Sequence, residues 1–334
     1  MIFDIHVHVV GFKAGEGGNY LCSWHKMPLL MRWILRRITR HSRKGMDPDR
    51  TFRRRFIQWI DESPVDRSVL LALDGVYQRN GAFSRDHTRI VVSNDYVVNY
   101  AAQHDKLLFG ASIHPYRRDA LDELDRVAQM GACLLKWIPS AQNITLDDPA
   151  CYAFYERLAS WKMPLLVHTG VEHSLPTFQH NLNDPRRLQP ALERGVTVIG
   201  AHCGTRIFLH EKSYYSQWKS MALQYPNFYG DLSAFVSPLH INPLQEILDS
   251  STLRCKIVFG SDFPVYLMPI WFVSKLGIKR VNELGKLENP FERSYSTMKA
   301  LGVPDEVFAR AENLLRLPRV AASPVVKRAE ERAT

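Results

Sequence analysis

Short apolar runs recur along the chain, and the spacing between most of them leaves room for a helix. The runs lie at residues 3–10, 65–73, 107–114, 132–138, 164–168, 196–202, 228–232 and 256–262. Helix start signals stand between them, because Asp148-Pro149 and Asp184-Pro185 each place a capping aspartate before a proline, and Gly195 suits a helix end. Strands and helices alternating over this length predict a parallel sheet, and eight such units close into a (β/α)8 TIM barrel.

An open, doubly wound sheet is the alternative arrangement of the same elements. The glycines that follow the first run, in GFKAGEGG at 11–18, lack the spacing of a dinucleotide-binding loop. We therefore expect one barrel domain over residues 1–318, with a long helical insertion after the first strand and a polar C-terminal tail over 319–334.

The first run, FDIHVHVV, alternates polar and apolar residues. Successive side chains of a strand point to opposite faces, so Asp4, His6 and His8 are expected on one face and the intervening Ile and Val residues on the other. A carboxylate and two imidazoles make a plausible metal platform, although a half-exposed edge strand would show the same pattern.

Polar residues also stand at the ends of the later runs, which favours the metal platform. In a barrel, functional residues gather at the carboxyl ends of the strands. The residues at these ends are His6, His8, His114, Lys136, His168, His202, Asp231 and Asp262.

Composition agrees with a large globular domain. The chain has 334 residues, of which 46% are hydrophobic and 11% aromatic, so a sizeable core can form and wholesale disorder is not expected. No apolar run approaches the roughly 20 residues that span a bilayer, and we expect no signal peptide because the N-terminus has no basic segment with a cleavage site. Five scattered cysteines are typical of reduced thiols, so the sequence predicts a cytoplasmic protein.

The formal charge of +9 is confined to residues 12–60, which carry twelve Lys or Arg against three acids. Because the rest of the chain is near neutral, we expect no nucleic-acid partner. This connection of about 50 residues far exceeds the usual 2–6 of a βα loop. Its first part, residues 27–40, places apolar residues at helical spacing and arginines on other faces. Its second part, residues 51–60, carries an apolar stripe at the same spacing. These residues are Leu30, Trp33, Ile34 and Ile38, then Arg32, Arg36 and Arg40, and finally Phe52, Phe56 and Ile60.

Three interpretations fit this basic insertion: a lid over the barrel mouth, a contact between copies of the chain, or peripheral contact of residues 27–60 with an anionic membrane. We favour the lid, because the segment leaves the catalytic end of the first strand. The apolar segment 264–276, after the eighth run, is expected to form another wall of the pocket.

Four motifs, DIHVHVV, PLLVHTG, VIGAHCG and IVFGSDFP, resemble the amidohydrolase superfamily in their order. Within it, the chain is most similar to the amidohydrolase-related branch that includes aminocarboxymuconate-semialdehyde decarboxylase. The resemblance runs from Met1 to about Pro318, and AENLLRLP resembles that branch's closing helix. It implies a barrel that holds a divalent metal, usually zinc, with a further residue that handles protons or polarises the substrate. The implied ligands are His6, His8, His168 and Asp262, and the implied proton-handling residue is His202.

The residue types themselves agree with this implication. Imidazoles and a carboxylate suit zinc and leave a position for water, whose pKa zinc lowers to about 7. Asp262 is then expected to take the proton of that water, and His202 to contact the substrate carbonyl or carry a proton. The competing interpretations are a helix cap for Asp262 and a satisfied core histidine for His202.

Lys136, within ACLLKWIP, has two readings under the resemblance. In binuclear relatives such as dihydroorotase and phosphotriesterase, the strand-four lysine is carboxylated and bridges two metals, and the strand-six histidine, here His202, binds the second. The branch named above lacks this lysine and is often mononuclear, which leaves Lys136 as a cation for a substrate carboxylate. We therefore expect one zinc ion, with two ions or Mn²⁺ as alternatives.

Other polar residues are weaker candidates. His114 and Asp231 either face the pocket or cap local turns. Asp4 is expected to orient a ligand histidine, while Glu172 and His173 either touch the substrate or lie in a solvated loop.

Hydrolysis and decarboxylation both suit such a site. We predict a metal-dependent hydrolase that uses a metal-activated water on a small amide, ester or lactone. Arginines over the pocket suggest that this substrate carries an anionic group. The alternatives are a metal-dependent non-oxidative decarboxylase and, less favoured, a non-catalytic binding protein that uses the basic segment.

Overall fold

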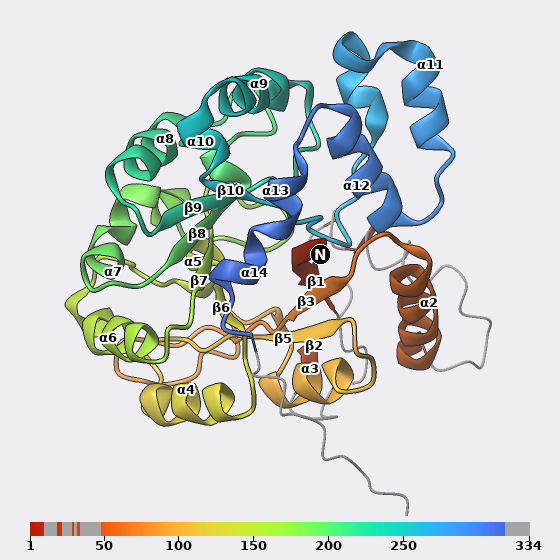
Figure 1. The fold of residues 1–334 in the computed structure, drawn as a ribbon. Coiled ribbons are helices and arrows are strands. Elements are labelled where there is room, and N and C mark those ends of the chain that lie inside the picture. Colours follow the sequence, from red (N-terminus) through yellow and green to blue (C-terminus); the bar gives the residue numbers. More distant parts are fainter. Residues whose placement is uncertain (10–18, 22–28, 30–31, 34–47, 318–334) are drawn as a thin grey trace, which may run out of the picture.

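A computed structural model of the chain describes residues 1–9, 19–21, 29, 32–33 and 48–317. Eight parallel strands form the central sheet in the order β1-β3-β5-β6-β7-β8-β9-β10 (Figure 1). Their bounds are Phe3–His8, Arg67–Leu71, Leu107–Ala111, Leu134–Trp137, Leu165–His168, Val198–Ala201, Phe228–Asp231 and Ile257–Val258. A separate antiparallel pair joins β2 (Tyr20–Leu21) to β4 (Ile90–Val91).

The sheet curls until its first and last strands meet. The amide of Ile5 donates to the carbonyl of Phe259 at 3.2 Å, and the amide of His8 donates to the carbonyl of Phe263 at 2.7 Å. Short strands with both faces buried are what a closed parallel sheet requires. The predicted TIM barrel is thus confirmed, and each of its eight strands lies within one of the predicted runs.

Helices surround the barrel and cover its outer face (Figure 1). Between the strands lie α2 to α10, at Pro48–Glu62, Asn94–Ala101, Ala120–Gln129, Pro139–Gln142, Tyr152–Ser160, Gln189–Glu193, Tyr215–Gln224, Ile241–Asp249 and Ser251–Arg254. After β10 come α11 to α14, at Val273–Gly285, Pro290–Ala300, Asp305–Ala309 and Ala311–Leu314. In the described part of the chain, 3-10 turns lie at Pro149–Cys151, His180–Asn183, Pro185–Leu188, His202–Gly204, Pro238–His240 and Pro269–Phe272. Within the described residues, no helix combines the length and apolar content needed to cross a membrane.

The predicted helix signals act as expected. The side chain of Asp148 accepts from the amide of Ala150, and that of Asp184 from the amide of Arg186, so each aspartate caps the turn that begins at the following proline. Gly195 has a φ of +79°, the left-handed conformation that commonly ends a helix.

Strand β1 departs from the predicted alternation. Its pairing with β3 shifts register between Asp4 and Val7, where β1 carries one extra residue. Ile5 consequently packs inside the barrel, whereas Val7 packs in the outer cluster under the helices. The expectation that the apolar residues of this strand share one face is therefore wrong. The cause is a β-bulge, which changes the direction of the side chains that follow it.

Helix α2 covers the last part of the basic insertion. Its stripe of Phe52, Phe56 and Ile60 is buried, and Phe56 packs against Phe263 with ring centroids 5.7 Å apart. The stripe therefore holds α2 onto the barrel wall and is not available to a membrane. Ahead of α2, the described residues of the insertion are 19–21, Leu29, Arg32 and Trp33. The remaining expected residues, Leu30, Ile34, Arg36, Ile38 and Arg40, lie outside the described residues, as does the tail over 319–334.

Candidate metal centre

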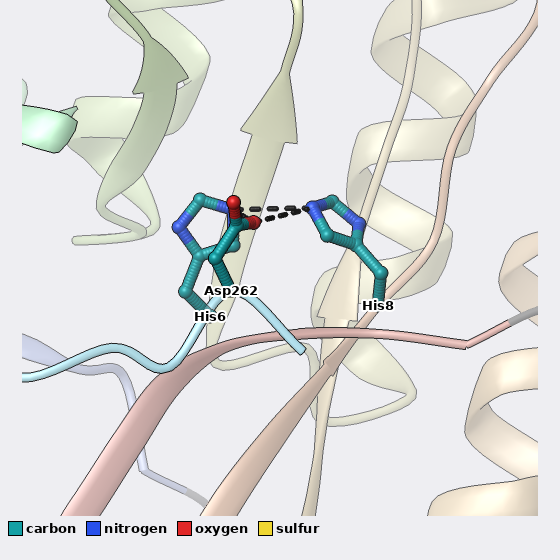
Figure 2. Close-up of side chains that lie close together, drawn as sticks. All are labelled: His6, His8 and Asp262. Carbon is teal, nitrogen blue, oxygen red and sulfur yellow. Dashed lines mark hydrogen bonds and ion pairs between the residues drawn. The ribbon is translucent and has the colours of Figure 1, made fainter. Parts of the chain in front are cut away.

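Two histidines of β1 and an aspartate that follows β10 converge at the carboxyl end of the barrel (Figure 2). The Nε2 atoms of His6 and His8 lie 3.2 Å apart. The Oδ1 atom of Asp262 lies 3.2 Å from the first of these nitrogens and 3.3 Å from the second. Three of the four ligands that the resemblance implied are thus brought together.

The spacing of these three atoms fits a metal ion. Zinc lies about 2.0–2.1 Å from nitrogen and oxygen ligands, so tetrahedral ligand atoms are about 3.3–3.4 Å apart. The three observed separations match this value. The donor set of two imidazoles and one carboxylate also has the composition that zinc accepts, so the residues fit a divalent metal.

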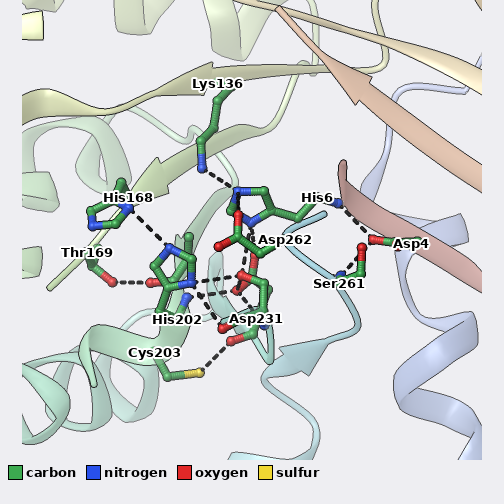
Figure 3. A network of polar contacts seen from close by, with 12 residues as sticks. Asp4, His6, Lys136, His168, Thr169, His202, Cys203, Asp231, Ser261 and Asp262 are labelled. Carbon is green, nitrogen blue, oxygen red and sulfur yellow. Dashed lines mark hydrogen bonds and ion pairs between the residues drawn. The ribbon is translucent and has the colours of Figure 1, made fainter. Parts of the chain in front are cut away.

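Asp231, at the end of β9, fixes the orientation of His6. The Nδ1 of His6 donates to the Oδ2 of Asp231 at 2.8 Å, which leaves the Nε2 lone pair directed at the centre. The other oxygen, Oδ1, accepts from the amide of His202 at 2.7 Å and from the amide of Ser233 at 3.1 Å. Figure 3 shows Asp231 between these groups. Asp231 therefore does not line the cavity; it supports the ligand beside it.

Asp4 does not have the orienting role that we expected for it. Its Oδ1 accepts from the backbone amides of His6, at 3.2 Å, and Ser261, at 2.9 Å (Figure 3). Burial raises the pKa of Asp4 to about 7. Asp4 thus ties β1 to the chain after β10, while Asp231 orients the imidazole.

His168 and His202 form a second pair beside the three donors (Figure 3). The Nδ1 of His202 lies 3.0 Å from the carbonyl oxygen of Ser233, which can only accept, so this nitrogen carries the proton. The Nε2 of His202 then accepts from the Nδ1 of His168 at 3.1 Å. Glu172 supports this assignment, with Oε2 3.4 Å from the same Nδ1.

This chain of hydrogen bonds leaves the Nε2 of His168 as a bare lone pair. Within the described residues this buried atom has no hydrogen-bond partner. Burial, together with the nearby His202 and Lys136, holds the pKa of His168 well below its usual range, so the ring is neutral. An unpaired acceptor is costly to bury, which suits an atom that awaits a ligand. His168 lies outside the cluster of three donors, and its place as a fourth ligand stays a prediction.

Lys136 reaches the centre from β6. It is 1% exposed, and its Nζ lies 2.9 Å from the Nε2 of His6 (Figure 3). Among the described residues, no carboxylate oxygen lies within ion-pair distance of this amine. A buried lysine without a carboxylate partner is costly, so the site must offer a compensating interaction.

Burial and neighbouring charges set the ionisation of the centre. Burial, together with the adjacent Lys136, lowers the pKa of His6 to about 4, against the pull of Asp262 and Asp231. Burial also lowers the pKa of Lys136 to about 8, against the pull of Asp262. Burial alone would raise the pKa of Asp262, but His6, His8 and His202 hold it well below its usual range. A neutral His6 imidazole beside the ionised carboxylate of Asp262 is the state that metal binding requires.

The backbone around the centre adopts left-handed conformations that residues other than glycine seldom take. His202 has a φ of +63° and Asp262 a φ of +58°, each of which costs about 1–3 kcal/mol. Position 260 requires glycine, because a Cβ atom there would lie 2.7 Å from the Cβ of His6. Strain and close approach together concentrate where the strand ends meet.

A cavity of about 590 Å³ opens above the centre, within the size range of small-molecule sites. Its inner end is formed by His8, His168, Glu172, His202 and Asp262. The segment after β10 forms part of its wall, as expected, through Pro264, Val265, Tyr266, Met268 and Trp271.

Two further candidates line the cavity. His173 lines the cavity and pairs with Glu211, 3.0 Å away. Trp33 of the basic insertion also lines the cavity, which agrees with the lid interpretation at that residue.

His114 is buried and is not among the described residues that line the cavity. Its Nε2 donates to the carbonyl of Gln142 at 2.8 Å, and its Nδ1 accepts from the amide of Tyr116 at 3.2 Å. Both ring nitrogens are thus engaged away from the cavity: Nδ1 closes the local turn at Tyr116, and Nε2 holds a carbonyl 28 residues further along the chain. This contradicts the pocket role and agrees with the capping role.

Ser233 could not be singled out from the sequence. Its Oγ lies 3.0 Å from the Nδ1 of His6, 2.9 Å from the Nδ1 of His202 and within hydrogen-bond distance of Asp231. The only signal was its position two residues after a strand-end aspartate, which many serines share.

Comparison with known proteins agrees with this architecture. Solved structures with a similar fold include an uncharacterised TIM-barrel protein from Bordetella bronchiseptica, which has a TM-score of 0.58 and 18% identity over 89% of this chain and 99% of that one. A probable 2-pyrone-4,6-dicarboxylic acid hydrolase from Acinetobacter baumannii has a TM-score of 0.55 and 13% identity over 94% and 98% of the two chains. The 5-carboxyvanillate decarboxylase of Sphingomonas paucimobilis has a TM-score of 0.54 and 12% identity over 95% and 99%.

None of the curated proteins compared with the chain matches it. The family model described as amidohydrolase matches residues 3–287, which include His6, His8, His168, His202 and Asp262. With the barrel and the strand-end residues, this match confirms the resemblance seen in the four motifs. The chain belongs to the amidohydrolase superfamily.

Proposed function

We propose that the protein is a metal-dependent hydrolase that cleaves a small ester, lactone or amide. The observation that carries the proposal is the convergence of His6, His8 and Asp262 at tetrahedral ligand spacing, at the inner end of a cavity of substrate size. We propose zinc as the metal, with Mn²⁺ as the alternative, since imidazole nitrogen suits the first and carboxylate oxygen suits both.

His6, His8 and Asp262 would hold the metal, with His168 as the candidate fourth ligand. A divalent ion there supplies a Lewis acid that polarises a carbonyl group and lowers the pKa of water. Asp262 is ionised and faces the cavity, so its carboxylate can accept the proton of the attacking water. His202 lines the same end of the cavity, and its Nε2 is an acceptor in this structure. Once Nε2 takes up a proton, the ring can donate a hydrogen bond to the carbonyl or pass that proton to the leaving group.

Lys136 decides how many metal ions the site holds. We propose one ion, with the Lys136 amine donating to the Nε2 of His6 in the metal-free protein, since these atoms lie 2.9 Å apart. A carboxylated Lys136 that bridges two ions, with His202 on the second, is the alternative. The free amine of Lys136 has a pKa of about 8, so a fraction of it is neutral at neutral pH, and carboxylation requires the neutral amine.

Decarboxylation is the second candidate. It is favoured by the fold of the 5-carboxyvanillate decarboxylase and needs a scissile carboxylate at the metal with a proton delivered to carbon. We place hydrolysis first because Asp262, ionised in the cavity wall, suits a base that takes a proton from water.

Metal analysis and an activity panel test the proposal. Wild-type protein is expected to hold about one equivalent of metal, and His8→Ala and Asp262→Asn to lose most of it. His104→Ala changes a surface histidine that pairs with Asp61, so it should keep the metal and serves as the matched control. Metal content unchanged in both site variants would contradict the metal centre.

The panel contains lactones, aryl esters, N-acyl compounds and phenolic or enol carboxylates, each assayed with Zn²⁺ or Mn²⁺. Hydrolysis that disappears in Asp262→Asn supports the first candidate. Release of carbon dioxide from the carboxylates, with no hydrolysis in the panel, would establish the second in its place.

A further inference from the structure

The cavity above the metal centre has a polar inner end and a mainly apolar remainder. Its polar residues gather at the inner end, where His8, His202 and Asp262 lie. The rest of the lining comes from several strand–helix connections and is mostly apolar, although His173, Ser174 and His240 are also part of it. Representative wall residues are Leu73, Ile138, Ile207, Val236, Met268 and Trp271.

No lysine or arginine is among the described residues that line the cavity. The lining residue His173 is already paired with the carboxylate of Glu211, 3.0 Å away. The two ionisable acids that line the cavity, Glu172 and Asp262, are both negative when ionised. Lys136 lies beneath the cavity with its amine on His6 and does not reach the lining. A carboxylate held against these walls would be desolvated without a partner, at a cost of several kcal/mol.

The mouth of the cavity extends the apolar surface to solvent. Trp33, Phe208, Met268 and Trp271 line the cavity and remain 50%, 51%, 47% and 38% exposed. Large apolar side chains that cluster in this way at the mouth of a pocket mark a site that receives an apolar ligand.

We propose that the part of the substrate that lies against the cavity walls is uncharged and apolar, so that the substrate is a lipophilic ester, lactone or amide. This inference rests on the proposed function in taking the cavity as the substrate site. It departs from the sequence-based expectation of an anionic substrate, which depended on arginines of the insertion. The apolar group fills the cavity while the scissile carbonyl reaches His202 and Asp262 at its inner end.

Two fluorescent probes that share one ring skeleton test the charge preference directly. N-phenylnaphthylamine is neutral, and anilinonaphthalene sulfonate adds a single negative charge. Wild-type protein is expected to bind the neutral probe at least about tenfold more tightly, because the walls offer the sulfonate no partner. The measurement is repeated after treatment with a chelator, so that neither metal binding nor turnover contributes. Equal or tighter binding of the sulfonate in the chelator-treated protein would overturn the proposal.

A matched pair of variants locates the binding site. Met268→Lys adds a cation to the cavity mouth, whereas Ile278→Lys adds one at an exposed position of α11 that does not line the cavity. Met268→Lys should shift the preference toward the sulfonate by about fivefold, the size of one partly exposed ion pair, and Ile278→Lys should leave it unchanged. Unfolding curves confirm that both variants are folded. An equal response of the two variants would refute the cavity as the site.

The hydrolysis panel keeps the two proposals apart. If uncharged esters with larger apolar groups are cleaved with higher kcat/KM than their carboxylated analogues, both proposals stand. If the neutral probe binds preferentially but no substrate is hydrolysed, the proposed function fails while the apolar site stands. If carboxylated substrates are hydrolysed preferentially, the apolar inference fails and the hydrolase assignment remains.

Discussion

Replacement of Asp231 by asparagine should weaken metal binding although Asp231 is not itself a ligand. Its two carboxylate oxygens accept from opposite sides. Oδ2 accepts from the Nδ1 of His6 at 2.8 Å, and Oδ1 accepts from the amides of His202 and Ser233 at 2.7 and 3.1 Å. An asparagine has one oxygen and one NH2 group, so in either orientation one donor of the protein would face another donor.

The backbone amides cannot change their role, whereas the imidazole of His6 can move its proton. With the NH2 group of asparagine toward His6, Nδ1 becomes the acceptor and the proton moves to Nε2, the atom that points at the centre. Loss of a partner that orients a metal-binding histidine typically lowers metal affinity 10- to 100-fold, or about 1.4–2.7 kcal/mol. We expect a loss within this range.

The assay is competition for zinc between the protein and a chromophoric chelator of known affinity, at pH 7. Asp249→Asn is the control, because Asp249 is exposed and its side chain accepts only from Gln245 among the described residues. A zinc affinity of Asp231→Asn within twofold of wild type, in protein shown to be folded, would refute the reasoning that Asp231 sets the tautomer of His6.

Three other substitutions test separate parts of the structure. His202→Asn should retain one metal ion per chain and lower turnover by about 10²–10⁴-fold, whereas loss of a second equivalent of metal would indicate a binuclear site. The buried ring of His114 has a pKa of about 4 against 6.5 in the unfolded chain, so its stabilising effect is complete above pH 6.5 and is lost as the pH falls toward 4. Urea unfolding should therefore show that wild type loses about 3 kcal/mol more than His114→Gln between pH 7 and pH 4, and parallel curves would disprove this. Lys136→Met removes a buried amine and should raise the thermal midpoint of chelator-treated protein by about 2 °C or more. A fall from two metal equivalents to one in that variant would instead show a carboxylated, bridging lysine.

The fold was accessible from the sequence because each strand of the barrel lies within a short apolar run, and two of these runs are followed by a clear helix signal. Parallel strands buried on both faces need such runs, and capping aspartates such as Asp148 and Asp184 mark the next helix by local hydrogen bonding alone. The insertion was less accessible. Its stripe of Phe52, Phe56 and Ile60 predicts an apolar face, but the pattern does not reveal which surface covers it.

The candidate site was accessible only in part, for a related reason. Strand ends identify residues that reach the barrel mouth, and His6, His8 and Asp262 do meet there. What each residue touches depends on contacts between distant segments. His114 stands at a strand end like the ligands, yet its ring donates to the carbonyl of Gln142, 28 residues further along the chain.

The bulge in β1 shows why sequence alternation alone could not assign the supporting residues. In a regular strand, Asp4 would lie on the same face as His6 and His8 and would be the natural partner for an imidazole. The extra residue between Asp4 and Val7 separates the two halves of the strand, so Asp4 bonds to backbone amides while the histidines turn toward the barrel mouth. The orienting carboxylate must then come from another strand, and Asp231 provides it from a position 225 residues further along the chain. The alternation of polar and apolar residues in the sequence does not reveal a bulge, because both bulged residues stay buried. The metal ligands could therefore be read from the motif, whereas the residue that orients them could be found only from the closed barrel.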